Sequence, residues 1–542
     1  MNRLPALVPV AALLLPLACH LGFSWIGFNP TDDGWLQAVA RRIADGEVPH
    51  RDFIFVRPAL SALLQVPLVW WGGEHIIWLS RLWGWLTLGA VCWIWSGRVA
   101  TDSALTRLAL YAIALPLCAH TFPVMAWHSL DAMLFCSLAV ALAARGTSWA
   151  WRGAFFCAGL AALCRQNFAV FPPLLLLATG GRWREWLTAG FCAALPALLY
   201  LAGLGLAGGV RDFFAQALAT GGAFKAVGVT RFVNETPFLV SSATGVSIAL
   251  VLGHPRMAAP AWVRWLAPLL LLAAGGWTVA ALWRSPGAFH GASFVLFGLV
   301  LGLTPPVLWS GGDKADRLTL VSGLALAWTT AISIGYNSPA LLAGVLLLLL
   351  WRLLHRLVPA AAAMRPVLLL LLAGTAAAFS HARQTFPYRD RPVAQLRWDA
   401  GEVLPGAAGL RTNVLTYATL ADLRRLTAQL EQEGRAHAIL TDFAAHWIRS
   451  GQPNVLSCEW PQETELGYSP ALFRRLFGDL RRLPPDARIL VQKYLVSDYE
   501  WRMAPVPGDW SYYFVQNWVR ANCPKAGESE FFEIYAPPPA AP

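Results

Sequence analysis

Charged residues are scarce in this chain. Asp, Glu, Lys and Arg make up 13% of its 542 residues, and 56% are hydrophobic. An average soluble protein is about 25% charged. This deficit excludes an ordinary soluble protein and indicates a polytopic α-helical membrane protein, with enough polar sequence left for one domain outside the membrane.

Several short motifs are also missing. The chain has no CxxC pair and no group of His and Cys at metal-ligand spacing. Its C-terminal part has no glycine-rich phosphate loop, and no small-x-small cleavage site follows the first apolar run. We therefore expect no cofactor, no nucleotide domain and an uncleaved N-terminal span. A divalent metal is possible, although no spacing indicates one.

Cysteine does not define a disulfide framework. Seven of the nine cysteines fall in or near apolar segments, where they are typical of small core residues. The other two, Cys458 and Cys523, lie in the polar C-terminal part. If that part is outside the cytoplasm, these two could form a disulfide. The sequence leaves the pairing open.

The basic excess has a specific distribution. The net charge is +11, yet residues 381–542 hold 18 basic and 18 acidic side chains, so the whole excess lies in residues 1–380. There it occupies short loops between apolar runs, which is the positive-inside pattern of cytoplasmic loops. Nucleic-acid binding would need a clustered basic face on a soluble module, and we expect no nucleic-acid partner.

The apolar runs predict about 13 transmembrane segments within residues 1–380, since a span needs roughly 20 apolar residues. The fifth and sixth are short, and we expect them to form a broken or re-entrant pair joined at Cys164–Asn167, because unpaired polar groups are disfavoured in lipid. With this number of crossings the basic loops all face the cytoplasm, and the N-terminus lies on the same side. Because the count is odd, the C-terminal part lies on the opposite side. The segments are 4–26, 75–96, 104–120, 128–144, 152–164, 167–179, 185–207, 236–253, 261–283, 288–310, 316–335, 338–357 and 366–380.

Two regions lie outside the predicted spans. The first outer loop, residues 27–74, carries an amphipathic helical period from Leu36 to Ile43 and a second apolar stretch from Ala59 to Trp71, which predict juxtamembrane helices. Residues 381–536 alternate helical and strand patterns, which predicts a small α/β domain on the periplasmic side. Residues 537–542 are expected to be a disordered tail.

Two adjacent carboxylates open the first outer loop. Asp32 and Asp33 directly follow the first span and precede the amphipathic helix. A carboxylate there can cap the helix by accepting bonds from its first amides. It can also act as the general base of a transfer reaction without a metal. Both roles are compatible, one for each carboxylate, and the position of the loop favours the catalytic one.

Four arginines are candidates for a phosphate site, because a guanidinium fork matches phosphate oxygens. Arg51 and Arg57 lie in the first loop, Arg81 near the outer end of the second span, and Arg165 in the polar break. Each has an alternative. Arg51 could pair with Asp52 or Glu47, and Arg81 could pair with a loop carboxylate.

Further polar residues lie at the predicted outer surface. Asp131, in the second outer loop, is a candidate second acid that holds the acceptor or orients a catalytic group. His128 could shuttle a proton, but could equally be an interfacial anchor. The remaining candidates are assigned to the substrate cavity, with helix packing and a simple turn as the alternatives: His50, Asp52, Gln166, Asn167, Tyr336 and Asn337.

The first loop resembles that of a known enzyme class. The segments Asp32–Gly34, Arg41–Ile43 and Gly46–Phe53, followed by Pro58, are similar to the first extracytoplasmic loop of bacterial GT-C glycosyltransferases. These are relatives of the protein O-mannosyltransferases and the lipid A aminoarabinose transferase. The resemblance covers roughly the first 170 residues, and the rest matches in architecture only. His50 replaces a common Tyr, and the WWDYG signature of oligosaccharyltransferases is absent.

The resemblance implies an enzyme of the bacterial inner membrane. Its substrates would be a polyprenyl-phosphate-linked sugar and a lipid, glycan or protein acceptor, with inverting transfer on the periplasmic face. Asp32 matches the catalytic acid of the family by position, and Asp33 stands where Glu is common. Two other classes remain open, a lipid or polysaccharide flippase or transporter, and a non-catalytic envelope assembly factor. The chain shows no evident inverted repeat of the kind many transporters carry.

Overall fold

The structure is a computed structural model of the chain. It describes residues 4–539, except 101–102, 220–229, 254–262, 310–312, 333–335, 359–360, 463–464, 468 and 495–512. The predicted tail is therefore described only as far as residue 539, and its last three residues lie outside the described part.

The structure is a helical membrane protein in outline, and each of the 13 predicted apolar segments is a helix. Six helical stretches are long and apolar enough to cross a bilayer by length and composition: Gly73–Val99, Trp183–Leu206, Trp265–Arg284, Pro286–Trp309, Pro339–Leu357 and Met364–Thr385. The other helices are shorter or less apolar. The helices that match the predicted segments are α1 (Leu4–Phe23), α4 (Ile76–Val99), α5 (Ala104–Ala119), α6 (His128–Ala143), α7 (Ser148–Cys164), α8 (Phe171–Thr179), α9 (Trp183–Leu206), α12 (Thr236–Gly253), α13 (Val263–Arg284), α14 (Pro286–Trp309), α15 (Lys314–Ala331), α16 (Ala343–Leu357) and α17 (Ala361–Thr385).

The polar break in the short pair is confirmed. Helix α7 ends at Cys164, Arg165 is extended, and a 3-10 turn over Gln166–Val170 leads into α8. The start of α7 and the end of α8 line one surface cavity together, so the two helices form a hairpin. Since α7 has 17 residues, its ends lie about 25 Å apart.

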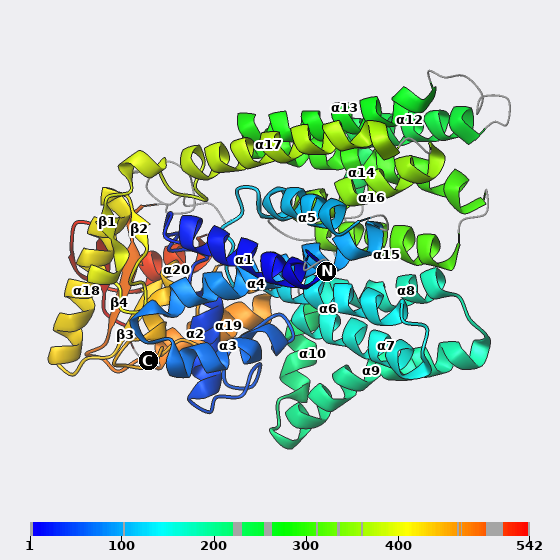
Figure 1. The fold of residues 1–542 in the computed structure, drawn as a ribbon. Coiled ribbons are helices and arrows are strands. Elements are labelled where there is room, and N and C mark those ends of the chain that lie inside the picture. The colour runs from blue at the N-terminus through cyan, green and yellow to red at the C-terminus, as the bar shows by residue number, and fades with distance from the viewer. Residues whose placement is uncertain are drawn as a thin grey trace.

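Basic loop residues gather at the end of the bundle where α7 begins, which we call the basic end. Arg152, Arg184 and Arg317 line one cavity there, together with Lys314. Arg352 joins them through Asp316 in α15. The other end carries the first loop and the C-terminal region, residues 386–539 (Figure 1). We call it the acid end.

The first loop contains the two expected helices. Helix α2 spans Trp35–Ala44 and α3 spans Leu60–Trp71, and a short 3-10 turn, Gly73–His75, leads into α4. Phe28 and Trp35 share one hydrophobic core with side chains of the C-terminal region such as Leu404 and Leu423. The loop is thus part of the folded interior. Helix α10 (Val210–Ala219) lies beside it.

The C-terminal region has the predicted α/β composition. A four-stranded sheet has the order β3-β4-β6-β5, with β3 and β4 parallel and the other pairs antiparallel. The short, polar strand β5 was not predicted, because it has no apolar alternation. The elements are β1 (Trp398–Asp399), β2 (Arg411–Thr412), α18 (Val414–Gln432), β3 (His437–Leu440), α19 (Pro470–Arg481), β4 (Arg488–Gln492), α20 (Phe514–Asn522), β5 (Lys525–Glu528) and β6 (Phe532–Tyr535).

Cys458 and Cys523 are both buried as free thiols in the same hydrophobic cluster. The sequence leaves open whether these two cysteines form a disulfide, and in the structure they do not.

Candidate functional site

The two adjacent carboxylates lie in a tight turn, residues 31–34, which we call the acid turn. Gly34 ends it with φ 81°, in the left-handed region, and starts α2. A Cβ at Gly34 would lie 2.6 Å from the Cβ of Ala445, so only glycine fits against the C-terminal region. Gly34 is the N-cap of α2 and no side chain caps it. The capping role considered for the carboxylates is therefore not seen.

Asp33 forms a buried ion pair. Its Oδ2 accepts hydrogen bonds from Nη2 of Arg81 and from the backbone N–H of Asn29, both at 2.9 Å. Arg81 also donates to three backbone carbonyl oxygens between Ser24 and Gly27. Of the two roles considered for Arg81, the structure thus has the pairing with a loop carboxylate. This pair fixes the end of α1 to the acid turn.

Asp32 has different partners. Its Oδ2 accepts hydrogen bonds from the hydroxyl of Tyr388 at 2.9 Å and from Nη1 of Arg389 at 3.1 Å. No hydrogen bond from any described residue reaches Oδ1. The residue is only 7% exposed, and burial raises the pKa of its carboxyl, while Arg389 and Tyr388 oppose that rise. Asp32 is therefore a buried carboxylate with one oxygen held and the other unclaimed.

Two more buried carboxylates hold the C-terminal region around Asp32. Asp390 accepts hydrogen bonds from the backbone N–H of Phe28 at 2.9 Å and from side chains of β2 and the residue after it. Asp442, which follows β3, accepts from Trp460, Gln462 and Gln492. Burial raises the pKa of both carboxyls. Asp442 is close enough to Asp32 to add to the rise in the pKa of Asp32.

A buried arginine lies on the membrane side of this group. Arg383, near the end of α17, is 6% exposed and makes no ion pair with any described residue. Its guanidinium lies over the rings of Trp85 and Phe379. It is also close enough to Tyr336 to interact with it electrostatically. An unpaired buried cation is costly, so this position favours an anionic ligand.

Tyr336 connects Arg383 to further polar residues. Its hydroxyl lies 3.2 Å from Nε2 of His120, and its ring stacks on the His120 ring. His290 lies beside both rings. Tyr336 also interacts electrostatically with Tyr388, the partner of Asp32. This places Tyr336 near the predicted acid, whereas Asn337 makes no hydrogen bond with the described residues of this group.

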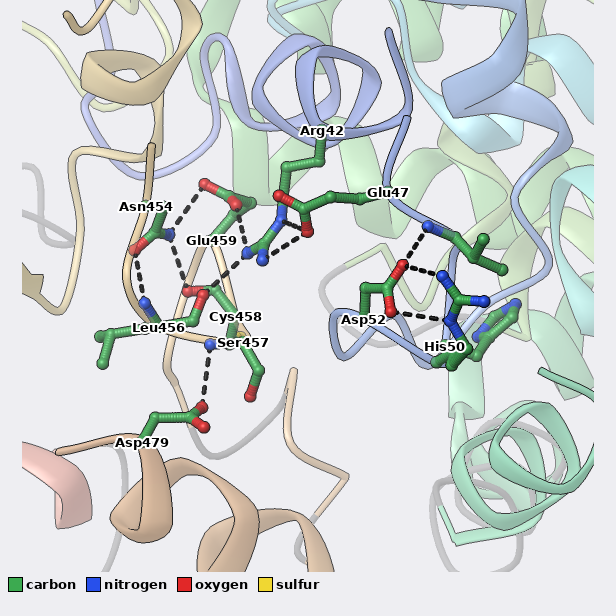
Figure 2. Close-up of polar contacts among 12 residues, drawn as sticks. Arg42, Glu47, His50, Asp52, Asn454, Leu456, Ser457, Cys458, Glu459 and Asp479 are labelled. Atoms are coloured by element: carbon green, nitrogen blue, oxygen red, sulfur yellow. Dashed lines mark hydrogen bonds and ion pairs between the residues drawn. The ribbon is translucent and has the colours of Figure 1, made fainter. Parts of the chain in front are cut away.

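The far end of α2 is tied to the C-terminal region as well. Figure 2 shows Arg42 between Glu47 of the first loop and Glu459, with N–O distances of 2.7 and 2.9 Å. Arg42 also donates to the carbonyl oxygen of Leu456. The helix after the acid turn is thus fixed at both of its ends.

Three other predicted residues have structural roles some distance along the loop. Arg51 forms a bidentate ion pair with Asp52, with both N–O distances 2.8 Å, which is the salt bridge considered as its alternative. His50 is fully buried, and its Nε2 lies 2.6 Å from the hydroxyl of Tyr200. Burial lowers the pKa of His50 to about 4, so the ring is neutral.

Arg57 is paired too. It forms a bidentate ion pair with Glu465 of the C-terminal region and lies over the ring of Trp35. His128 packs at the edge of the same Trp35 ring. Neither ring nitrogen of His128 has a hydrogen-bond partner among the described residues.

The polar break lies under this aromatic group. Arg165 donates to the hydroxyl of Ser129 at 2.6 Å and makes no ion pair with a described residue. Gln166 donates to the carbonyl oxygen of Val56 in the first loop, and Asn167 to that of Thr329 in α15. Asp131 accepts a hydrogen bond from the indole of Trp83 at 2.9 Å and is buried. The break is thus the point where the bundle meets the first loop.

No protein-family model matches the chain, and no curated protein sequence matches it significantly.

Proposed function

We propose that the chain is a membrane glycosyltransferase of GT-C type that moves a sugar from a polyprenyl-phosphate carrier to an acceptor at the acid end. The observation that carries the proposal is the state of Asp32. Its carboxylate is buried, one oxygen is fixed by Tyr388 and Arg389, and the other has no partner among the described residues. A general base needs this combination of fixed orientation and an available oxygen.

The proposed step is a single displacement. The acceptor hydroxyl gives its proton to Oδ1 of Asp32 while its oxygen forms a bond to the anomeric carbon of the donor. The bond from that carbon to the phosphate oxygen breaks, and polyprenyl phosphate leaves with the electron pair. Because the nucleophile attacks opposite the leaving group, the anomeric configuration inverts.

Buried arginines support a site for the leaving phosphate. Arg383 is the first candidate, since it is unpaired among the described residues and lies near Tyr336 and the Asp32 group. Arg165 is the second, since its only partner among the described side chains is Ser129. Arg51, Arg57 and Arg81 already bind carboxylates and are weaker candidates than they are on sequence alone.

The proposed topology has 13 crossings in a bacterial inner membrane. The clustering of loop arginines at one end and of the C-terminal region at the other supports it, because positive loops face the cytoplasm. The first loop and the C-terminal region would then be periplasmic, and the N-terminus cytoplasmic. Asp131 would position the acceptor from beside α3.

Incubation of the purified protein with a radiolabelled polyprenyl-phosphate sugar and a crude envelope fraction tests the proposal. An enzyme releases free polyprenyl phosphate and gives a labelled product of inverted configuration. A flippase or transporter would move the labelled lipid between the leaflets of a vesicle without consuming it, and an assembly factor would do neither. Intact donor after long incubation would refute the proposal.

A further inference from the structure

Three potential metal ligands meet in the C-terminal region, apart from the proposed site. Glu431 lies in the last turn of α18, His437 begins β3, and His446 lies in the 3-10 turn Ala444–Ile448. One ligand atom from each lies within 4.8 Å of the other two. Three separate elements thus bring their metal-binding atoms to one point.

The spacing of the two rings suits a metal ion. Nε2 of His437 lies 3.3 Å from Nε2 of His446. Two nitrogens bound to one tetrahedral zinc ion at 2.0–2.1 Å are about 3.3 Å apart. Without an ion, the same distance fits a weak hydrogen bond in which one ring donates to the other. The two alternatives differ in whether both nitrogens keep a free lone pair.

His437 is almost fully buried, at 1% exposed. Nδ1 of His437 is buried without a hydrogen-bond partner among the described residues.

A surface cavity gives access to the group. It has a volume of about 140 Å³ and is lined by Glu431, His446, Thr427 and Ser450, among others. Among the described residues, the hydrogen-bond donor to Glu431 is the Ser450 hydroxyl, at a long distance of 3.4 Å. Arg449, at the rim, is turned to an ion pair with Glu74. The cavity has room for an ion that keeps a water molecule as its fourth ligand.

We propose that Glu431, His437 and His446 bind one divalent cation of the zinc class. The site is independent of the proposed function. His446 lies in the segment that packs on the acid turn, since Phe443 donates its backbone N–H to the Pro30 carbonyl at 3.0 Å and Ala445 contacts Gly34. A bound ion therefore stiffens the wall behind the acid turn by linking α18, β3 and this segment.

Metal titration of the full-length protein tests the site. The detergent-solubilised protein, with its tag removed, is stripped with a chelator and dialysed against micromolar Zn²⁺, and bound metal is counted by mass spectrometry. We expect one zinc per chain and, with Co²⁺ in its place, visible absorption typical of a four-coordinate ion. Failure of the wild-type protein to retain stoichiometric zinc overturns the proposal.

Matched variants locate the ion. His437→Gln, His446→Gln and Glu431→Gln should each weaken zinc affinity at least about tenfold. His75→Gln, at an exposed histidine, and Glu433→Gln, on the exposed turn beside Glu431, should bind zinc like the wild type. Gel filtration checks that each variant is folded. Unchanged affinity in the folded His446→Gln variant would place the metal elsewhere and overturn the assignment.

Discussion

The two ends of the helical bundle each hold a buried aspartate–arginine pair, and they differ in what surrounds it. At the acid end, Arg81 lies 2.9 Å from Asp33, with side-chain exposures of 4% and 2%. At the basic end, Arg352 lies 2.8 Å from Asp316, with exposures of 8% and 2%. The two pairs are close equivalents in distance and burial.

The surroundings separate a structural site from a candidate catalytic one. At the basic end the second oxygen of Asp316 also has a partner, Arg356 at 2.9 Å, so both oxygens of this carboxylate are held. At the acid end a second carboxylate, Asp32, is buried beside the pair with one unclaimed oxygen. Oδ1 of Asp33 also has no hydrogen-bond partner among the described residues. Asp33 is 1% exposed and Asp32 7%, so Asp32 is the more accessible of the two carboxylates and the better candidate for chemistry.

Replacing Asp32 should have the largest effect. In Asp32→Asn the side chain keeps its shape but no longer accepts a proton, so we expect sugar transfer to fall by about 10²–10⁴-fold. Asp45→Asn, at the end of α2 in an exposed ion pair with Arg41, is the matched control and should transfer normally. The measurement is the initial rate of polyprenyl phosphate release. A normal rate in the folded Asp32→Asn variant would end the catalytic assignment.

Removing the aspartate of either buried pair should lower the free energy of unfolding to a similar extent. Asp33→Ala and Asp316→Ala each leave an uncompensated buried arginine, and we expect the free energy of unfolding to fall by about 3–5 kcal/mol. Denaturant titration in detergent measures it. Among molecules that remain folded, only Asp33→Ala should lower transfer, because only that pair holds the acid turn. Equal losses of transfer in the two variants would remove the distinction between the ends.

Two glycines sharpen the account of the acid turn. Gly34→Ala combines a positive φ with a clash against Ala445, and it should cost about 1–3 kcal/mol and lower transfer. Gly46, with φ 93°, has open space around its Cβ position. Gly46→Ala therefore has only the free-energy cost of the positive φ, without a clash. Thermal denaturation and transfer rates compare the two. A variant at Gly34 that transfers like the one at Gly46 would contradict the need for close contact there.

Arg389 should set the pH dependence. Burial raises the pKa of Asp32, and the Arg389 charge lowers it. Arg389→Gln removes the charge, so the pKa of Asp32 rises further and the acid limb of the transfer rate moves to higher pH. The control is Arg397→Gln, at an exposed arginine of the same region. A shift toward lower pH would contradict the ion pair as described.

Arg51 should matter least. Its partner Asp52 is adjacent in the chain, and the two side chains are 44% and 31% exposed; pairs that are open to solvent contribute little to stability. We expect Arg51→Gln to transfer sugar at the wild-type rate at all donor concentrations. A raised donor KM would show that Arg51 binds the phosphate after all.

The sequence predicts local features of this fold well. Length and hydropathy locate the 13 apolar helices, because each is a continuous run. The 3.6-residue period finds α2, and the break at Arg165 follows from polar residues between two apolar runs. In the C-terminal region the alternating patterns predict the α/β composition, whereas the polar edge strand β5 has no apolar alternation to indicate it.

Long-range partners could not be predicted from the sequence. Tyr388 and Arg389 lie more than 350 positions from Asp32, and nothing in their local sequence points to it. Glu431, His437 and His446 have the same limitation, since their spacing of six and nine residues matches no metal motif and only the turn after β3 brings them together. Arg81 illustrates the intermediate case, because the sequence offered both of its roles and the geometry selected one.

Cryo-electron microscopy of the Asp32→Asn variant with a bound polyprenyl-phosphate sugar tests the central claim most directly. We predict density for the sugar with its anomeric carbon near residue 32, leaving about 3.5 Å between that carbon and an acceptor oxygen, and phosphate density beside Arg383. The account would be contradicted by lipid density confined to the basic end, together with an acid turn that neither bulk solvent nor lipid can reach.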